Sequence, residues 1–287
     1  PLRLVGSEMC IRDRAGGVYL PINTGYTASE LDYFIKDSEA KIVIIDSEAE
    51  EKVSTYLNDN VTLLTLNADE SGTLTNLANE QNIHFDAIER GPDDLAAILY
   101  TSGTTGKSKG AILSHQNLLS NTKVLKDYWK FTNADVLLHM LPIYHTHGLF
   151  VASNLLAYVG GSIIFLPKFD IDQALNWMKK ATTMMGVPTF YTRLLSDIRF
   201  DKNLTDHMRL FISGSAPLLS ETHKEFEERT NKKILERYGM TETNMSTSNP
   251  YSEKRIAGTV GLPLPGIKLR IADDKGNEVK QLSLIHI

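Results

Sequence analysis

The sequence predicts an α/β protein in which helices cover parallel-rich sheets. From residue 16 onward, short runs rich in valine, isoleucine and leucine alternate with segments of helical periodicity. Such alternation is typical of parallel strands joined by helical crossovers. With 287 residues, of which 42% are hydrophobic and 23% charged, the chain can bury a large core as one or two domains.

The first part of the chain shows this alternation most simply. Thr27 and Glu30 form a capping-box pattern, in which each side chain can bond the other's backbone at the start of a helix. The expected elements are helices at 31–40, 47–57 and 74–80 and strands at 41–46, 61–66 and 95–99. The first two strands are each followed by a helix, which is the arrangement that parallel pairing requires.

The second part continues the alternation on either side of an interrupted apolar run. Ser114 is placed to cap a helix that ends near Trp129, and residues 136–141 are apolar. Further helices are expected at 171–180, 190–195 and 219–228, and strands at 161–166, 183–187, 209–213 and 233–236. The run at 149–165 is broken by serine, asparagine and two glycines, so it falls short of a membrane span and is predicted to be buried core.

The composition narrows the class of partner. The net charge is −5 and no basic cluster is long enough to track a nucleic-acid backbone, which favours a small-molecule ligand. Cys10 is the only cysteine, so an internal disulfide framework and a cysteine-rich metal site are excluded. The N-terminal residues lack the basic and apolar regions of a secretory signal, and we expect a cytoplasmic protein.

The segment 100–110, YTSGTTGKSKG, carries the strongest chemical signal. It lies between apolar runs at 95–99 and 111–113, which indicates a loop between two strands. Its glycines let the backbone approach a ligand, its hydroxyls add hydrogen-bond donors, and Lys107 and Lys109 add positive charge. These properties predict a loop that binds phosphate groups.

Two other interpretations of this segment are weaker. Gly106, Lys107 and Ser108 match the second half of a nucleotide-binding P-loop, but Thr101 replaces its first glycine and a strand follows instead of a helix. A plain solvated loop of similar composition is the common alternative. Two lysines in so short a segment, between strands of buried character, favour a ligand site.

Two further segments follow predicted strands, where ligands bind in α/β sheets. In LPIYHTHGL, residues 141–149, His145 and His147 have the spacing of a metal pair, but without companion ligands the polar wall of a ligand channel is favoured. In MGVPTFYTRLL, residues 185–195, a proline starts a helix and Arg193 lies one turn in. A helical arginine is usually solvated, so this segment alone gives Arg193 no function.

Two more segments complete the set. In FISGSAPL, residues 211–218, a strand ends in a sharp turn that either presents backbone to a flat ring or is a plain strand-to-helix turn. In ILERYGMTET, residues 234–243, Tyr238 can stack on a ring, Thr241 can bond a phosphate oxygen and Glu242 can hold a hard cation. Taken together, the segments are a stronger signal of a ligand site than any one of them alone.

The combination of the segment at 100–110 with Tyr-Gly-Met-Thr-Glu at 238–242 resembles the acyl-adenylate-forming (AMP-binding) enzymes. This family includes acyl-CoA synthetases, luciferases and peptide-synthetase adenylation domains, and the resemblance covers nearly all of residues 15–280. The segments LPIYHTHGLF, MMGVPTFYTRLL and ERYGMTETNMSTSNPY are similar to those of the malonate–CoA ligase branch (malonyl-CoA synthetases). The resemblance implies the large N-terminal domain of that fold.

The resemblance also implies a role for each matched position. The β- and γ-phosphates of ATP would be held by Thr101, Ser102, Gly103, Thr104, Thr105, Gly106, Lys107 and Lys109. The nucleotide site around adenine would be formed by Gly214, Ser215, Ala216, Tyr238 and Gly239. Thr241 would touch the α-phosphate, Glu242 would bind Mg2+ and His145 would lie beside the acyl group, so these three are the expected catalytic residues.

The implied reaction uses ATP, Mg2+ and coenzyme A. A carboxylate attacks the α-phosphorus of ATP to give an acyl-adenylate and pyrophosphate, and the thiol of coenzyme A then displaces AMP. The malonate branch implies malonate, or methylmalonate, as the acid. Arginine matches the second carboxylate bidentately, and Arg193 and Arg237 are the candidates. A salt bridge with Glu236 or Glu228 is the alternative role of Arg237.

The two ends of the chain depart from the pattern. Residues 1–14 and 282–287 are expected to be non-native or frayed ends, so residues 15–281 are expected to form a partial N-terminal domain. Members of the family continue further, with a ribose-binding aspartate, a hinge and a small domain that carries a catalytic lysine. We therefore expect the 287-residue chain alone to show negligible turnover. The competing interpretations are a nucleotide-binding module without turnover and a ligase for a fatty or aromatic acid.

Overall fold

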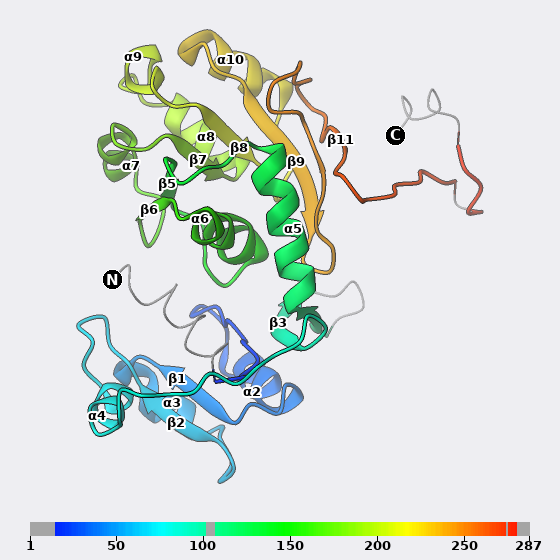
Figure 1. The fold of residues 1–287 in the computed structure, drawn as a ribbon. Coiled ribbons are helices and arrows are strands. Elements are labelled where there is room, and N and C mark those ends of the chain that lie inside the picture. The colour runs from blue at the N-terminus through cyan, green and yellow to red at the C-terminus, as the bar shows by residue number, and fades with distance from the viewer. Residues whose placement is uncertain (1–14, 102–106, 274, 280–287) are drawn as a thin grey trace.

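The computed structural model describes residues 15–101, 107–273 and 275–279, which form an α/β fold (Figure 1). A seven-stranded sheet with helices on both faces makes up the larger part. A two-stranded sheet with short helices makes up the smaller part, and a β-hairpin followed by a long helix joins the two. The predicted fold class, parallel-rich sheets covered by helices, is confirmed.

The elements occur in the following ranges. The strands are β1 (Ile42–Ile45), β2 (Thr62–Thr65), β3 (Leu95–Thr101), β4 (Lys109–Ser114), β5 (Val136–His139), β6 (Ser162–Phe165), β7 (Thr183–Gly186), β8 (Leu210–Ser213), β9 (Ile234–Met240), β10 (Asn244–Ser248) and β11 (Leu262–Pro263). The α-helices are α2 (Ala28–Asp37), α3 (Glu50–Ser54), α4 (Thr73–Asn79), α5 (His115–Tyr128), α6 (Asn154–Val159), α7 (Ile171–Met178), α8 (Pro188–Leu195), α9 (Lys202–Thr205) and α10 (Ser220–Thr230). Ser47–Ala49 is a 3-10 turn, and His147–Ser153 is π-helical.

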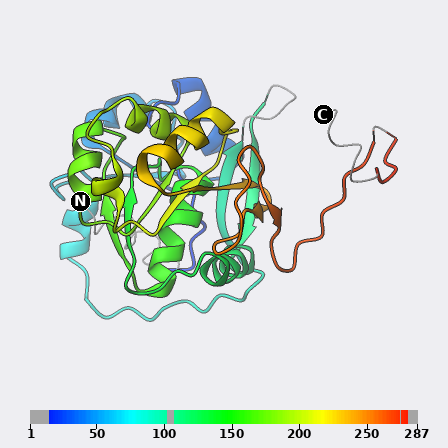
Figure 2. The same ribbon diagram turned by 90° about the horizontal axis from the view of Figure 1, so that it is seen from above.

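The large sheet has the strand order β11-β10-β9-β8-β7-β5-β6. Its five strands from β6 to β9 are parallel, while β10 pairs antiparallel with both β9 and β11. The smaller β1–β2 sheet is parallel, and β3 and β4 form an antiparallel hairpin. Figure 2 shows this hairpin beside the strands at the β9–β10 end of the large sheet. The parallel strands therefore all end at one edge of the sheet.

Alternation along the central strands builds an apolar layer on each face. Phe211 and Ile234 belong to the core that α7, α8 and α10 cover, whereas Ile212 and Leu235 belong to the core that α5, α6 and the π-helical segment cover. Consecutive strand residues point to opposite faces, so the same alternation continues beyond Leu235. Glu236 and Arg237, which follow it, are therefore directed to different faces of the sheet.

The starts of the two helices with capping boxes were predicted correctly, but the polar strand β10 was not predicted. The capping boxes at Thr27 and Ser114 are both formed. The helix expected at 47–57 is divided into a 3-10 turn and the short α3. The strand expected at 233–236 extends to Met240 and is followed by β10, which was not predicted because its sequence NMSTS lacks an apolar alternation.

The apolar run after residue 146 folds as helix. The π-helical segment is followed directly by α6. Leu149 and Val151 of the segment and Leu155 of α6 are buried. The sequence predicted buried core here, which is confirmed, but not its helical form. Within residues 15–101, 107–273 and 275–279, no helix combines the length and the apolar character that crossing a bilayer would require.

Candidate active site

The four ligand-binding segments predicted around the large sheet all follow strands that end at the same edge. Residues 141–149 follow β5, 185–195 include the end of β7 and the start of α8, 211–218 include the end of β8, and 234–243 include the end of β9. Because β5, β7, β8 and β9 are parallel, their carboxyl ends lie together. In open α/β sheets this edge is where ligands bind.

The predicted phosphate loop connects the two strands of the β3–β4 hairpin. Thr101 lies opposite Lys109 at the loop end of the hairpin. The Tyr33 hydroxyl donates to the Ser108 carbonyl at 2.9 Å, and the Lys107 ammonium lies 5.6 Å from the centre of the Tyr33 ring. Ser102, Gly103, Thr104, Thr105 and Gly106 lie outside the described residues. Helix α2, which carries Tyr33, therefore holds the second stem of the loop.

The structure brings the hairpin to the turn between β9 and β10. The Thr101 hydroxyl donates to Glu242 Oε1 at 3.4 Å, although the two residues are far apart in the sequence. Glu242 is exposed and Thr241 is half-buried on the same turn. In the described part of the chain, no group of three or more histidine, cysteine, aspartate or glutamate side chains could hold a metal ion.

Tyr238 and the 214–216 turn present exposed surface at the same edge. Tyr238 is 45% exposed at the end of β9. Ser215 and Ala216 are exposed as well, and Ser215 has a φ of 70°, an uncommon left-handed conformation for a residue with a side chain. Gly239 must be glycine, because a Cβ there would collide with the backbone of Asn244. The turn and the tyrosine ring are both available to a flat ligand.

Arg237 is the unusual residue of the site. Its side chain is buried, with the residue 4% exposed, and its Nε and Nη2 groups have no hydrogen-bond partner among the described residues. Burial lowers the pKa of Arg237 to about 10, so the guanidinium still carries its charge at neutral pH. A buried charge without a counter-ion is costly. An anion in contact with these atoms would offset that cost.

The alternative salt bridge of Arg237 is not formed. Glu236 points to the opposite face of the sheet, where its Oε1 lies 3.3 Å from His223 Nδ1 and accepts a bond of 2.9 Å from the Gly258 amide. Among the described residues, no ion pair joins Arg237 to Glu236 or Glu228. Sequence adjacency suggested this pair, but the period of two in a strand separates the two side chains.

His147 adjoins the same buried space. Its Nδ1 lies 3.2 Å from the Ser215 hydroxyl, and its Nε2 is buried without a partner in the described part of the chain. Burial, and then the nearby charge of Arg237, hold the pKa of His147 well below its usual value, so the ring is neutral. Gly214 completes the contact, since a Cβ there would lie 2.6 Å from Arg237 Nε. We call Arg237, His147, Gly214 and Ser215 the Arg237 cluster.

His139 supports this cluster from the end of β5. Its Nε2 lies 2.8 Å from the Gly148 carbonyl, and its Nδ1 accepts a 3.3 Å bond from the Leu141 amide. These two bonds define the neutral tautomer, and burial lowers the pKa of His139 to about 4. The sequence analysis assigned residues 136–141 only an apolar character. The histidine at a strand end next to a histidine-rich segment was the available signal.

The remaining two predicted residues lie in different surroundings. His145 is exposed at the sheet edge with its ring centre 4.8 Å from that of Tyr144. Arg193 is exposed on α8, and its guanidinium lies 4.4 Å from the centre of the Phe169 ring. The structure therefore brings His145 to the edge with the other segments, whereas it places Arg193 in solvent, unlike Arg237.

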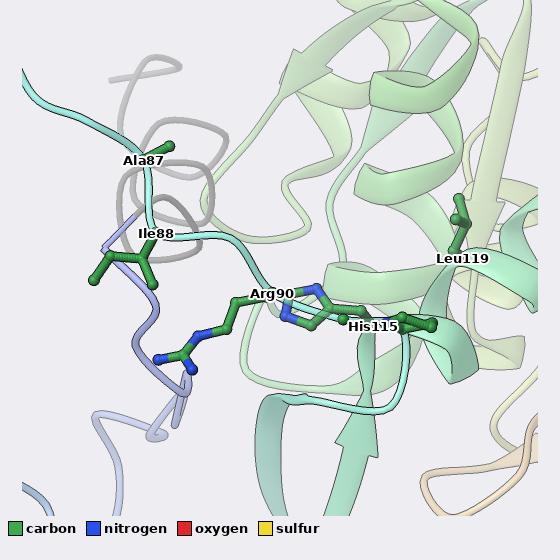
Figure 3. Close-up of a pocket in the computed structure, with 7 residues that line it drawn as sticks. Ala87, Ile88, Arg90, His115 and Leu119 are labelled. Carbon is green, nitrogen blue, oxygen red and sulfur yellow. The ribbon is translucent and has the colours of Figure 1, made fainter.

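A separate pocket lies away from this edge (Figure 3). It is formed between the segment 87–92 and the first residues of α5, with Ile88 and Leu119 in its wall. Arg90 is already engaged, because its Nη2 donates to the Gly16 carbonyl at 2.7 Å. None of the predicted site residues lines this pocket.

A mostly parallel sheet that is covered by helices on both faces, with polar segments at the carboxyl ends of its parallel strands, is the architecture of many nucleotide-binding α/β proteins. The comparisons identify the family: the sequence profile of the AMP-binding enzymes matches residues 13–282, and the chain belongs to this family. The resemblance seen in the sequence motifs is thereby confirmed.

Relatives define the branch that this chain is similar to. A mitochondrial malonate–CoA ligase of Mus musculus is 37% identical over 284 residues, which cover 91% of this chain and 47% of the relative. The crystal structure of ATP-bound MatB from Rhodopseudomonas palustris is 57% identical, with a TM-score of 0.91, over 95% of this chain and 55% of that one. A malonyl-CoA ligase complex with methylmalonyl-CoA and AMP is 32% identical, with a TM-score of 0.78, over 91% and 55% of the two chains. The chain spans about half the length of the curated relatives it matches.

Proposed function

We propose that the protein is an ATP-dependent acid–CoA ligase that activates malonate. The single observation that carries the choice of acid is Arg237, a buried guanidinium beside the neutral His147 whose Nε and Nη2 atoms have no hydrogen-bond partner among the described residues. The similarity to malonate–CoA ligases supports the reaction, and the site supports the acid. Malonate has two carboxylates, of which one reacts and the other must be bound without reacting.

The nucleotide would bind across the exposed edge. Thr101, Lys107 and Lys109 would contact the β- and γ-phosphates, and Thr241 would contact the α-phosphate. The adenine ring would lie between Tyr238 and the turn at 214–216, both of which present exposed surface. The solved relative that holds ATP, at a TM-score of 0.91, supports this assignment.

Glu242 is the proposed ligand of Mg2+. Its carboxylate is exposed and lies within reach of the Thr101 hydroxyl, so it faces the stems of the phosphate loop. The ion would neutralise charge on the phosphates when bound. The protein's own task in the first half-reaction is then to hold the acid in line with the α-phosphorus while the bond to the leaving pyrophosphate breaks.

The distal carboxylate of malonate would pair with Arg237. A planar guanidinium offers parallel N–H groups that match a carboxylate, and Nε and Nη2 are the two atoms left without a partner. His147, held neutral by burial and by the arginine, would add one N–H donor from Nε2 while Nδ1 accepts from the Ser215 hydroxyl. His145, exposed at the edge, would lie beside the reacting carboxyl group.

The same geometry explains why a monocarboxylate should be a poor substrate. Acetate would enter the site without an anion for Arg237 and would leave the buried charge unpaired, at a cost of roughly 3–5 kcal/mol. An added methyl group changes binding by only about 1–3 kcal/mol. Methylmalonate is therefore a second expected substrate, in keeping with the relative whose complex holds methylmalonyl-CoA and AMP.

In the second half-reaction, the thiol of coenzyme A would attack the acyl carbon, and AMP would leave with the electrons of the broken acyl–phosphate bond. Among the described residues we assign none to coenzyme A. The 287-residue chain spans about half of its relatives, so we expect it alone to bind Mg·ATP without turnover.

ATP–pyrophosphate exchange tests the proposal on protein translated from the complete coding region. We expect exchange with malonate and methylmalonate and far slower exchange with acetate. Equal rates for malonate and acetate would overturn the choice of acid, and no exchange with any acid would overturn the ligase. Isothermal titration of the 287-residue chain with Mg·ATP, run in parallel, separates a nucleotide-binding module from a chain that binds nothing.

A further inference from the structure

Helix α5 holds β10 through one side chain that replaces a missing strand. The Asn121 carboxamide donates from Nδ2 to the Met245 carbonyl at 2.9 Å and accepts from the Met245 amide at its Oδ1 at 3.3 Å. Both backbone groups of one strand residue are thus bonded by one amide side chain. This is the pattern that a neighbouring strand would supply.

The Asn121 side chain can take the place of a strand because β11 covers only part of the edge of β10. β11 pairs only with Thr247 and Ser248, so the first residues of β10 have β9 on one side and no strand on the other. Between Met245 and Thr247 the β9–β10 register also shifts, which marks a bulge. Asn121 therefore bonds β10 at Met245, the second residue of the strand, close to the turn that carries Thr241 and Glu242.

The other end of the same helix is attached to the other end of the same strand. Trp129, which directly follows α5, donates from its indole N–H to the Ser248 hydroxyl at 2.9 Å. Met245 itself is buried in the core beside Leu125 of α5. The helix and the strand are thus joined at two points, one near the turn and one remote from it, as their side-by-side course in Figure 1 suggests.

Helix α5 also continues directly from the phosphate hairpin. β4 begins at Lys109 and ends at Ser114, and Ser114 caps the helix through its bond from the Asn117 amide at 3.2 Å. Asn121 lies two turns into α5. A short rigid path therefore runs from Lys109 through β4 and α5 to Asn121, and from there across to the β9–β10 turn.

We propose that Asn121 is a positioning residue that sets the separation between the phosphate hairpin and the Thr241–Glu242 turn. The two halves of the triphosphate site come from segments that are bonded directly through the Thr101–Glu242 contact of 3.4 Å, which is at the limit of a hydrogen bond. Asn121 supplies the firm attachment that this contact lacks. This inference rests on the proposed function, because the distance between the hairpin and the turn affects binding only if a triphosphate and its cation lie between them.

The substitution Asn121→Asp tests the inference by titration. An ionised carboxylate keeps the shape of the side chain and can still accept from the Met245 amide, but it faces the Met245 carbonyl with an acceptor in place of a donor. One of the two bonds is thus replaced by repulsion, which weakens the attachment of the turn. A protonated carboxyl regains one donor and one acceptor. Near pH 8 we expect Mg·ATP to bind the variant about tenfold more weakly than the unmutated chain. The facing Met245 carbonyl disfavours the ionised form and should raise the pKa of the substituted carboxyl above the ordinary aspartate value of about 4, so we expect the ratio to fall as the pH is lowered to about 5.

Ser248→Ala is the matched control. It removes a bond between the same helix and the same strand, but at the end remote from Glu242. We expect it to lower the thermal midpoint without changing Mg·ATP affinity by more than about twofold.

The outcomes separate this inference from the proposed function. If the unmutated chain fails to bind Mg·ATP, the nucleotide site itself is wrong. If it binds and Asn121→Asp binds equally well at pH 8, the positioning role is overturned. An affinity loss in Asn121→Asp that low pH does not restore, or an equal loss in Ser248→Ala, would also overturn it, because either result would indicate general destabilisation of β10.

Discussion

Two arginines of the large sheet have opposite surroundings. Arg209, just before β8, donates from Nε and Nη2 to the two carboxylate oxygens of Asp135 at 2.6 and 2.8 Å, and from Nη1 to the Trp129 carbonyl at 3.2 Å. Its guanidinium also lies 4.7 Å from the centre of the Phe131 ring. Arg237, near the carboxyl end of β9, is buried more deeply and leaves Nε and Nη2 unpaired.

The difference follows the two edges of the sheet. Arg209 precedes its strand, at the amino edge, where a complete set of partners indicates a structural role. Arg237 lies where the strands end and ligands bind, and its partners are incomplete. Burial alone would raise the pKa of Asp135, but the bonds from Arg209 bring it below its ordinary value. Arg237 has no such counter-ion among the described residues, which is why the proposed function assigns it to the second carboxylate of the acid.

The largest expected effect is on the structural arginine. Asp135→Ala should lower the free energy of unfolding by roughly 3–5 kcal/mol, because the substitution leaves the Arg209 charge without its partner. Urea unfolding followed by circular dichroism measures this change. Asp172→Ala, which removes an exposed partner of Arg199, is the control and should leave stability unchanged within error. Similar losses of unfolding free energy in the two variants would contradict the structural role of the Arg209–Asp135 pair.

The next effect is a pH dependence at the carboxyl edge. The folded-state pKa of His139 is about 4, below its ordinary value, so acid protonates the unfolded chain first and favours it. The stability contributed by neutral His139 is complete above the unfolded pKa and is lost as the pH falls toward 4. From pH 7 to pH 5 we expect a loss of about 2 kcal/mol. His139→Gln should flatten this slope in urea titrations, and an unchanged slope would contradict the assignment.

The smallest expected effect comes from a substitution in the Arg237 cluster. Gly214→Ala places a methyl group where the Arg237 guanidinium now lies, so the charge must shift away from its present position. We expect KM for malonate to rise about tenfold, a loss near 1.4 kcal/mol, with little change for acetate. Steady-state kinetics on protein from the complete coding region measures both. An equal rise for the two acids would indicate general distortion of the turn.

Much of this architecture could be predicted from the sequence, since local periodicity determines most elements. Helix caps at Thr27 and Ser114 and the strand ends at the ligand edge follow from short-range patterns. The surroundings of Arg237 could not be predicted, because the strand was expected to end at Glu236. Only when β9 is known to continue to Met240 does it follow that Glu236 and Arg237 point to opposite faces of the sheet. Asn121 was missed for a similar reason, as its partner Met245 lies in a polar strand that has no sequence signal.

The most direct test of the account compares two substitutions in one assay. In Arg237→Met and Arg193→Met proteins from the complete coding region, the ratio of kcat/KM for malonate to that for acetate is measured by pyrophosphate exchange. We expect the ratio to fall about 100-fold or more in Arg237→Met, as loss of a buried charge pair implies, and to stay within about twofold in Arg193→Met, whose side chain is exposed. An unchanged ratio in Arg237→Met, or a loss confined to Arg193→Met, would contradict the assignment of Arg237 as the partner of the second carboxylate.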